Sequence, residues 1–422
     1  MSRHGRRGAA LAAAVWALAA CTMPGGQGFT LDGSGGRPSH PPGPTGPAVR
    51  IGVVTDLTGA DAQLGVAQRQ GAELAVRERG GRAGNHRLSV VVADDRGRPD
   101  VALARASELV KTGHVDVLTG CVSAPTGLAV NQVAKEAGVP YLATCQTDQF
   151  DRPPDLGPAT FGLAPLPDQV VSAVTPWVLR NLGRRLLFLE PEQPWGHQQY
   201  DAFDRTVRGA GGFIEGIVWS PPGTTDFTSY VPRIQAAHPD VLMLGLAGRD
   251  QEIFLQQARQ FGLDPQTRIF EFLSDTVLDD QLGFAAVAGT YAATSFLWNT
   301  PDAGGQRFAR DYQAAYGRPP GAAAAAVHDA VTLVAGQVAA ERYRPSDLAG
   351  GLSGMSVHLS GGAGFSRACD HQAFLPTYIV QGLSQAEAAG RGGSARYGYR
   401  AVVATIPPDE RQGPSCTDLG LH

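Results

Sequence analysis

The sequence lacks the short motifs that mark several large classes of enzyme. Its 422 residues contain no Gly-x-Ser-x-Gly nucleophile elbow, no Walker phosphate loop and no His-Glu-x-x-His metal motif. His371 follows Cys369 closely, but further ligands at the spacing of a zinc site are missing. We therefore expect no enzymatic activity, no cofactor and no metal site.

A strong excess of one charge is also absent. The formal net charge is -4 at pH 7, and Lys and Arg are scattered along the chain after its first residues. Proteins that bind nucleic acids usually carry a basic patch or stripe. We therefore expect no nucleic-acid partner.

Long apolar runs are scarce, and the clearest one lies at the start of the chain. Basic residues within 1–7 precede an apolar run over 8–20, which is too short to remain in a bilayer because a spanning helix needs about 20 residues. This layout predicts a secretory signal peptide over residues 1–20. The run ends in Leu18-Ala-Ala-Cys21, which resembles a bacterial lipobox, and an ordinary signal peptide cleaved nearby is the alternative. We expect no later segment to span a membrane.

The residues from Cys21 onward predict how the exported protein is held. In a lipobox protein this cysteine is diacylated and becomes the mature N-terminus, and several acyl chains together anchor firmly. Residues 21–47 are rich in Gly and Pro and poor in core-forming residues, which favours a flexible tether. We expect a monomeric lipoprotein whose folded body is held at the outer face of the cell membrane.

Cysteine is scarce too, with five residues in the chain. If Cys21 is lipidated, four remain in an oxidising compartment where disulfides persist, and four cysteines allow three pairings. We favour Cys121 with Cys145, because they follow two apolar runs expected to be neighbouring strands. We also favour Cys369 with Cys416, because both lie in one C-terminal segment. Four buried free thiols are the alternative.

The body of the chain alternates short apolar runs with longer helical patterns, which predicts βα units. The strands are apolar enough for parallel sheets covered on both faces. The alternation breaks at the Pro-rich residues 151–158 and then restarts, and a mature length near 400 residues exceeds the usual limit for one core. We predict two doubly wound α/β lobes.

Several segments of the chain resemble the branched-chain amino-acid-binding family of ABC-importer solute receptors in their order and spacing. In the first half these are VRIGVVTDLTG at 49–59, VADD at 92–95 and LTGCVS at 118–123. In the second half they are Trp195-Gly196 and Tyr316-Gly317.

The family resemblance implies a fold and a function. It implies the type I periplasmic-binding-protein fold, in which three crossing strands form a hinge between two lobes and a solute binds at the carboxyl ends of the strands. In this fold we expect one lobe to comprise residues 48–165 plus 297–365 and the other to comprise residues 166–296 plus 366–422. It also implies capture of a small polar solute, an amino acid or an amide- or carboxylate-like molecule, and delivery to ABC permease subunits. A ligand-sensing lipoprotein regulator with the same fold is the alternative.

Three residues lie where a strand passes into a helix, namely Ser123, Ala124 and Thr126. Free backbone N–H groups and the positive helix end should favour a carboxylate there. The family commonly has a hydroxyl residue at the place of Ala124, so its role would shift to Ser123, Thr126 or backbone amides. The alternative is that Ser123 simply caps the helix.

The next strand is followed by Cys145, Gln146 and Thr147. Thr147 matches a family position that contacts an amino-acid ligand, and its alternative role is to cap its own loop. Leu64 and Trp195 fall where the family often presents covering side chains from opposite lobes, and ordinary packing is their alternative.

An amino-acid ligand also needs an anion for its ammonium group. Asp275 is our first choice for this anion, and Glu271 and Asp279 are the other candidates. Tyrosines that the family has near Ala247 are missing, so the ligand class stays open.

Overall fold

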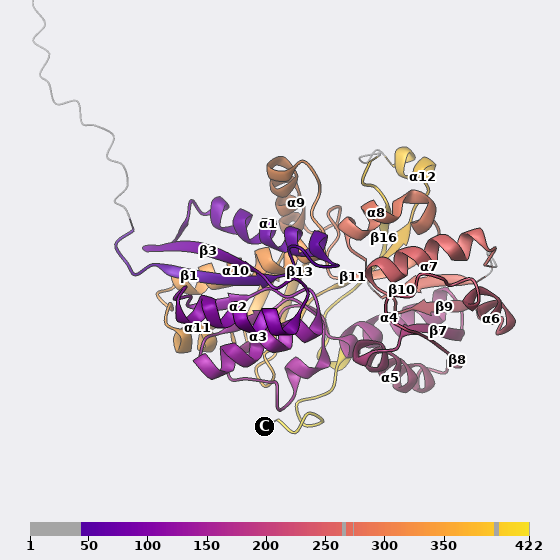
Figure 1. The fold of residues 1–422 in the computed structure, drawn as a ribbon, viewed down its shortest axis with the longest axis horizontal. Coiled ribbons are helices and arrows are strands. Elements are labelled where there is room, and N and C mark those ends of the chain that lie inside the picture. Colours follow the sequence, from indigo (N-terminus) through magenta and orange to yellow (C-terminus); the bar gives the residue numbers. More distant parts are fainter. Residues whose placement is uncertain (1–43, 264–266, 273, 392–395, 422) are drawn as a thin grey trace, which may run out of the picture. The chain divides into compact units, whose positions relative to one another are not determined.

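The computed structural model describes residues 44–263, 267–272, 274–391 and 396–421. The expected signal peptide, Cys21 and nearly all of the expected tether lie outside the described residues. Figure 1 shows the fold with its elements labelled.

Six strands form the first sheet, in the order β2-β3-β1-β4-β5-β6. They are β1 (Val49–Thr55), β2 (Arg82–Ala83), β3 (His86–Asp94), β4 (Val117–Thr119), β5 (Tyr141–Ala143) and β6 (Thr160–Gly162). Neighbouring strands are parallel from β3 to β6, whereas β2 is antiparallel to β3. The parallel βα series expected for the first half of the chain is therefore confirmed.

Helices cover both faces of the first sheet because its strands are apolar on both sides. Val49, Ile51 and Val53 of β1 pack on one face with α1 (Ala62–Glu78) and α10 (Ala322–Ala339). Val54 packs on the other face with α2 (Pro99–Lys111) and α3 (Ala124–Ala137). In Figure 1, α1 lies above β1 and β3, and α2 and α3 lie below them.

One helix bears on the expectation that no later segment spans a membrane. Helix α10 is long and apolar enough to cross a bilayer by length and composition, but 61% of its apolar window is buried inside the protein. It packs along α1 in the core of the first sheet. Its apolar character therefore belongs to a buried core helix.

Seven strands form the second sheet, in the order β16-β15-β11-β10-β9-β7-β8. They are β7 (Arg185–Pro191), β8 (Phe213–Ser220), β9 (Val241–Leu244), β10 (Arg268–Glu271), β11 (Tyr291–Thr294), β15 (Thr377–Gly382) and β16 (Arg400–Ile406). The strands from β8 to β11 are parallel, whereas β15 and β16 join one edge in antiparallel pairing. The second sheet is thus mixed at that edge.

Two groups of helices sandwich the second sheet. One face carries α4 (Pro167–Asn181) and α5 (Pro194–Gly209), and the other carries α6 (Tyr230–Ala236), α7 (Gly248–Gln260) and α8 (Thr276–Val287). The remaining elements are α9 (Ala303–Tyr316), α11 (Pro345–Leu352), α12 (Gln385–Gly390), β12 (Ser356–Leu359), β13 (Gly362–Ser366) and β14 (Ala373–Phe374). We call the first sheet with α1, α2, α3, α9, α10 and α11 the first lobe, and the second sheet with α4 to α8 and α12 the second lobe.

The chain passes between the two sheets after β6, after β11 and after β14. The lobe limits inferred from the sequence stay a prediction, and they assign residues 366–422 to the second lobe. Within that range, β14 pairs with β13 and adds Ala373 to the core of the first lobe.

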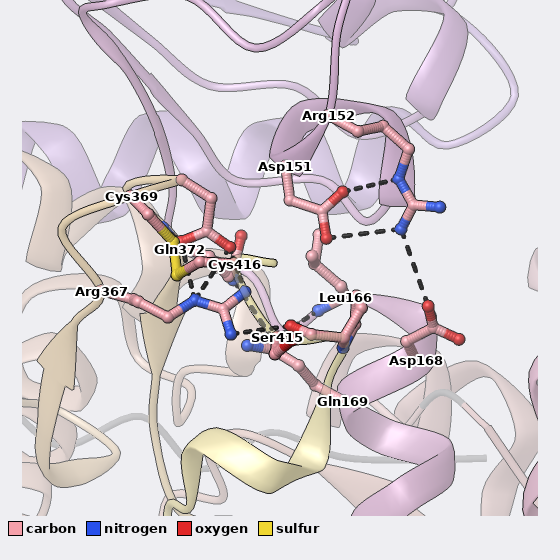
Figure 2. A network of polar contacts seen from close by, with 12 residues as sticks. Asp151, Arg152, Leu166, Asp168, Gln169, Arg367, Cys369, Gln372, Ser415 and Cys416 are labelled. Carbon is pink, nitrogen blue, oxygen red and sulfur yellow. Dashed lines mark hydrogen bonds and ion pairs between the residues drawn. A yellow bond between two sulfur atoms is a disulfide. The ribbon is translucent and has the colours of Figure 1, made fainter. Parts of the chain in front are cut away.

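Two glutamines tie the first and third connections together. The Gln169 side chain on α4 donates to the Ala373 carbonyl at 3.3 Å and accepts from the Leu166 N–H at 2.8 Å. The Gln372 side chain donates to Gln169 Oε1 at 3.2 Å and to the Ala164 carbonyl at 2.9 Å. Figure 2 shows this network from close by.

The C-terminal tail forms a further link beside these connections. After β16 the chain reaches α4 through the short 3-10 turn Glu410–Gln412, and the disulfide Cys369–Cys416 then ties the tail to the segment before β14. Arg367 Nη1 also donates to the Pro414 carbonyl at 2.8 Å (Figure 2). The structure thus contains the pairing of Cys369 with Cys416 that the sequence favours.

Acidic residues gather near the same connections. Asp148, in the 3-10 turn Asp148–Asp151, accepts from the Asp168 N–H at the start of α4 at 3.4 Å. Arg152 pairs with Asp151 at 2.7 Å and lies 3.6 Å from Asp168 (Figure 2). Burial, followed by the charge of Asp168, raises the pKa of Asp148 to about 7.

Candidate functional site

A cavity of about 570 Å³ lies between the two lobes, within the usual size range of small-molecule sites. Loops that follow β1, β4, β5 and β6 line it from the first lobe, together with the start of α10. Loops that follow β7, β9, β10 and β11 line it from the second sheet. The carboxyl ends of the parallel strands therefore meet at one site, as they do in open α/β sheets.

Most of the residues singled out from the sequence reach this cavity. Of the residues chosen from the sequence, those that line the cavity are Leu64, Ser123, Ala124, Cys145, Gln146, Thr147, Trp195 and Asp275. Thr126 is buried behind this lining, and its hydroxyl donates to the Ser123 carbonyl at 2.9 Å. Their role in binding stays a prediction.

The start of α3 opens on the cavity. Ser123 has an extended backbone, and its side chain makes no capping hydrogen bond to the helix. Its hydroxyl lies 3.1 Å from the Thr126 hydroxyl instead, so the alternative role of a helix cap is not the one observed. Because a helix leaves its first N–H groups without intrahelical partners, those of Ala124 and Thr126 can donate hydrogen bonds to an anion.

The disulfide Cys121–Cys145 fastens the loops after β4 and β5, which is the other pairing favoured by the sequence. It lies against Gly127 of α3, where a Cβ atom would come within 2.4 Å of Cys145 Sγ. A larger residue would push the helix away from the disulfide. The disulfide and Gly127 together hold the start of α3 close to the loop that carries Thr147.

Thr147 is fully buried at the edge of the cavity. Its hydroxyl accepts from the Gln149 N–H at 3.4 Å, so it caps its own turn while the residue lines the cavity. Both roles considered from the sequence are therefore compatible with its position.

Apolar side chains face the cavity from both lobes. Leu64 comes from α1 and Trp195 from the first turn of α5, and both are half-buried. Leu128 and Leu278 add further apolar surface. A bound solute would cover this surface and gain hydrophobic stabilisation from it.

Asp275 is engaged by two backbone groups. Its Oδ1 accepts from the Val277 N–H at 2.8 Å, and its Oδ2 accepts from the Ala323 N–H at 2.9 Å. Burial raises the pKa of Asp275 above its usual value, and these hydrogen bonds act against that rise.

The other two candidates for an ammonium partner lie outside the cavity lining. Arg400 of β16 is fully buried and reaches Glu271 and Asp279, each at 2.9 Å. Burial raises the pKa of Asp279 to about 6 although the Arg400 charge acts against it. These carboxylates are the counterions of a buried arginine, because a buried charge must be paired.

Asp61 and Gln68 line the cavity but were missed from the sequence. Gln68 is buried, accepts from the Thr55 hydroxyl at 2.7 Å and donates to the Cys121 carbonyl at 2.7 Å. Its position four residues after Leu64 on α1 was the available signal, since residues at this spacing share a helix face. Burial, followed by the charges of Asp56 and Asp250, raises the pKa of Asp61.

The charge of the cavity wall is one-sided. Among the described residues that line it, the charged ones are Asp61 and Asp275, and none is Lys, Arg or His. Binding of an anionic group of a solute would therefore depend on the backbone N–H groups at the start of α3. In the part of the chain that the structure describes, no group of three His, Cys, Asp or Glu residues is arranged to hold a metal ion.

Comparison with known proteins assigns the family. The sequence profile of the family described as periplasmic binding protein matches residues 48–388. Leu/Ile/Val-binding protein homolog 3 of Brucella melitensis is 26% identical over 271 residues, which make up 62% of this chain and 70% of the relative.

Solved structures share the fold over most of this chain. A branched chain amino acid ABC transporter periplasmic ligand-binding protein from Burkholderia xenovorans has a TM-score of 0.79 at 25% identity and covers 87% of this chain and 97% of its own. A solute binding protein of an ABC transporter from R. palustris, in complex with benzoate, has a TM-score of 0.74 at 20% identity and covers 86% of this chain and 97% of its own. The resemblance inferred from the sequence and its expected fold are thereby confirmed, and the chain belongs to the periplasmic binding protein family.

Proposed function

We propose that the protein is an extracytoplasmic receptor that captures a small polar solute between its lobes and delivers it to an ABC permease. The solute is an amino acid or an amide- or carboxylate-like molecule. The observation that carries the proposal is the cavity between the lobes, whose lining includes eight residues chosen for a binding role from the sequence. The name of the Brucella melitensis relative, Leu/Ile/Val-binding protein homolog 3, and the benzoate complex of the R. palustris protein support this solute class.

The chemistry of the cavity wall suggests how the solute is held. The start of α3 receives a carboxylate or an amide oxygen through backbone N–H groups at Ala124 and Thr126. Gln146 and Thr147 add hydrogen bonds, and Leu64 and Trp195 cover the apolar part of the solute from opposite lobes. If the solute carries an ammonium group, Asp61 is the carboxylate that lies open to it, because both oxygens of Asp275 already accept hydrogen bonds.

Attachment of the protein to the membrane favours direct delivery of the solute to a permease in the same membrane. Acylation of Cys21 tethers the folded body as a monomer to the outer face of the membrane, close to the permease subunits. Closure of the lobes traps the solute, and the closed form presents both lobes to the permease. Chemical conversion of the solute forms no part of this function.

The test is a thermal-shift screen of the purified body against amino acids, amides, urea and small carboxylates that include benzoate. A solute at a hundred times its Kd should stabilise the folded state by about 2.7 kcal/mol. X-ray scattering should then show compaction with the same solute. Stabilisation by none of these solutes, or turnover of an ester, amide or glycan, would contradict the proposed function.

A further inference from the structure

The carboxylate of Asp275 joins two helices that belong to different lobes. Asp275 is the N-cap of α8 in the second lobe, and its Oδ1 accepts from the Val277 N–H at 2.8 Å. Its Oδ2 accepts from the Ala323 N–H at 2.9 Å, in the first turn of α10 in the first lobe. One side chain thus binds the starts of two helices, where a negative charge is favoured.

The packing around this contact is close on both sides. At Gly321, directly before α10, an added Cβ atom would lie 1.9 Å from Asp275 Oδ1. Only the absence of a side chain at this position gives the carboxylate room. Val277, which lies on α8 two residues after Asp275, packs in a core cluster with Ala67 of α1 and Ala324 of α10.

The contact lies at the wall of the solute cavity. Asp275, Ala322 and Ala323 all line the cavity, so the contact forms where a bound solute would touch both lobes. Separation of the lobes would pull Ala323 away from Asp275 while the hydrogen bond to Val277, within α8, would persist. The bond to Ala323 therefore exists only when α8 and α10 are together.

We propose that Asp275 is a positioning residue that latches the two lobes in the closed form, and that it is not the partner of a solute ammonium group. This proposal rests on the proposed function in that closure traps a solute. The latch strengthens closure for any solute that fits the cavity, whatever its charge, because the bond joins protein to protein.

The test uses a variant that separates the two hydrogen bonds. Serine is a good N-cap, so Asp275→Ser keeps the cap of α8. Its shorter side chain has a single oxygen and cannot also accept from the Ala323 N–H. Gly321→Ala disturbs the same contact from the other lobe. The control is Asp302→Ser, because Asp302 caps α9 through the Gly305 N–H at 2.8 Å wholly within the first lobe.

The first readout needs no solute. We expect faster hydrogen exchange at the Ala323 amide and a larger scattering radius in Asp275→Ser and in Gly321→Ala, with a melting temperature close to that of the unaltered protein. Asp302→Ser should leave both readouts unchanged. Exchange at Ala323 and a scattering profile that are the same in Asp275→Ser and the unaltered protein would overturn the latch, whether or not any solute binds.

The second readout uses L-leucine and 4-methylpentanoate, which share a side chain but differ in the ammonium group. The latch predicts that Asp275→Ser weakens both probes by a similar factor of about 10 to 100, as expected for one hydrogen bond to a charged group, mainly through faster dissociation. Loss of L-leucine binding with unchanged binding of 4-methylpentanoate would instead make Asp275 the ammonium partner and overturn the proposal. If neither probe binds at millimolar concentration, leucine-like solutes are excluded from the proposed function, while the exchange experiment still decides the latch.

Discussion

Replacement of both Cys369 and Cys416 by serine removes a cross-link between the C-terminal tail and the segment before β14. The two cysteines are 47 residues apart in the sequence. In the chain-entropy treatment of disulfides, a loop of this length restricts the unfolded chain by about 14 cal/mol/K, which is about 4 kcal/mol at about 25 °C. We therefore expect the free energy of unfolding to fall by about 2–4 kcal/mol, since measured losses often lie below the calculated value.

Urea unfolding of the oxidised protein and of the double serine variant measures this loss. The matched control is the double serine variant of Cys121 and Cys145, which are 24 residues apart. For its shorter loop the same treatment gives about 3.5 kcal/mol instead of about 4 kcal/mol, so its loss should be slightly smaller than that of the tail disulfide. A loss below about 1 kcal/mol for the tail disulfide would refute the argument from loop closure and would mean that the unfolded chain is already compact there.

The two disulfides should also differ in their effect on solute binding. Cys145 lines the cavity, whereas Cys369 and Cys416 do not. Loss of the tail disulfide should therefore leave the affinity for a solute nearly unchanged and should widen the range of lobe openings seen by X-ray scattering, because the tail links the lobes beside their connections. Loss of Cys121–Cys145 should weaken binding because it frees the loops after β4 and β5.

Three further perturbations test the electrostatics and the cavity. The folded-state pKa of Asp148 is about 7, above the ordinary value of 3.8 for this side chain. The folded protein therefore binds more protons than the unfolded chain between about pH 4 and 7, and its unfolding free energy should fall as the pH rises through that window, by at most about 1.4 kcal/mol per pH unit. Asp148→Asn should flatten this slope in urea unfolding measured at several pH values, and an unchanged slope would contradict the assignment. Arg400→Leu leaves Glu271 and Asp279 buried without their cation and should lower the unfolding free energy by about 3–5 kcal/mol, with partial recovery when both acids are also replaced by amides. Trp195→Ala should weaken a bound solute by roughly 10- to 100-fold in calorimetry, because a covering aromatic side chain contributes about 1.5–3 kcal/mol. Trp219→Ala is its control, because Trp219 packs on His197 and does not line the cavity, and an equal effect of both variants would argue against a covering role.

The regular elements could be predicted where local pattern and tertiary environment agree. The apolar run over residues 49–55 forms β1, because a buried strand of a parallel sheet needs apolar side chains on both of its faces. Helix α8 was not expected, since its apolar residues show no clear helical face and Gly283 interrupts it with a non-helical conformation. The short strands β12 and β13 lie in a Gly-rich stretch that carries little strand signal.

The residues that line the cavity could be predicted only where they follow strands of the parallel sheet. Ser123, Ala124 and Thr147 come directly after parallel strands, so their approach follows from the topology. The disulfide Cys121–Cys145 follows from the same neighbouring strands. Asp61 reaches the cavity from the position just before α1, for which the sequence carries no specific signal. Gln68 could have been inferred only from its helical spacing to Leu64.

The acids near the cavity show why charge alone does not assign a binding role. Glu271 and Asp279 were candidates for an ammonium partner from the sequence. A buried carboxylate pairs with a cation of the protein, and here the cation is Arg400, which lies on a strand more than a hundred residues later. Asp275 takes two backbone N–H groups, one of them from the opposite lobe. Arg400 and Ala323 are distant in sequence from the carboxylates that they contact, and they come close only after folding. What distinguishes a solute-binding carboxylate from a structural one is therefore its unused hydrogen-bonding capacity at the cavity wall, which points away from Asp275 and toward Asp61.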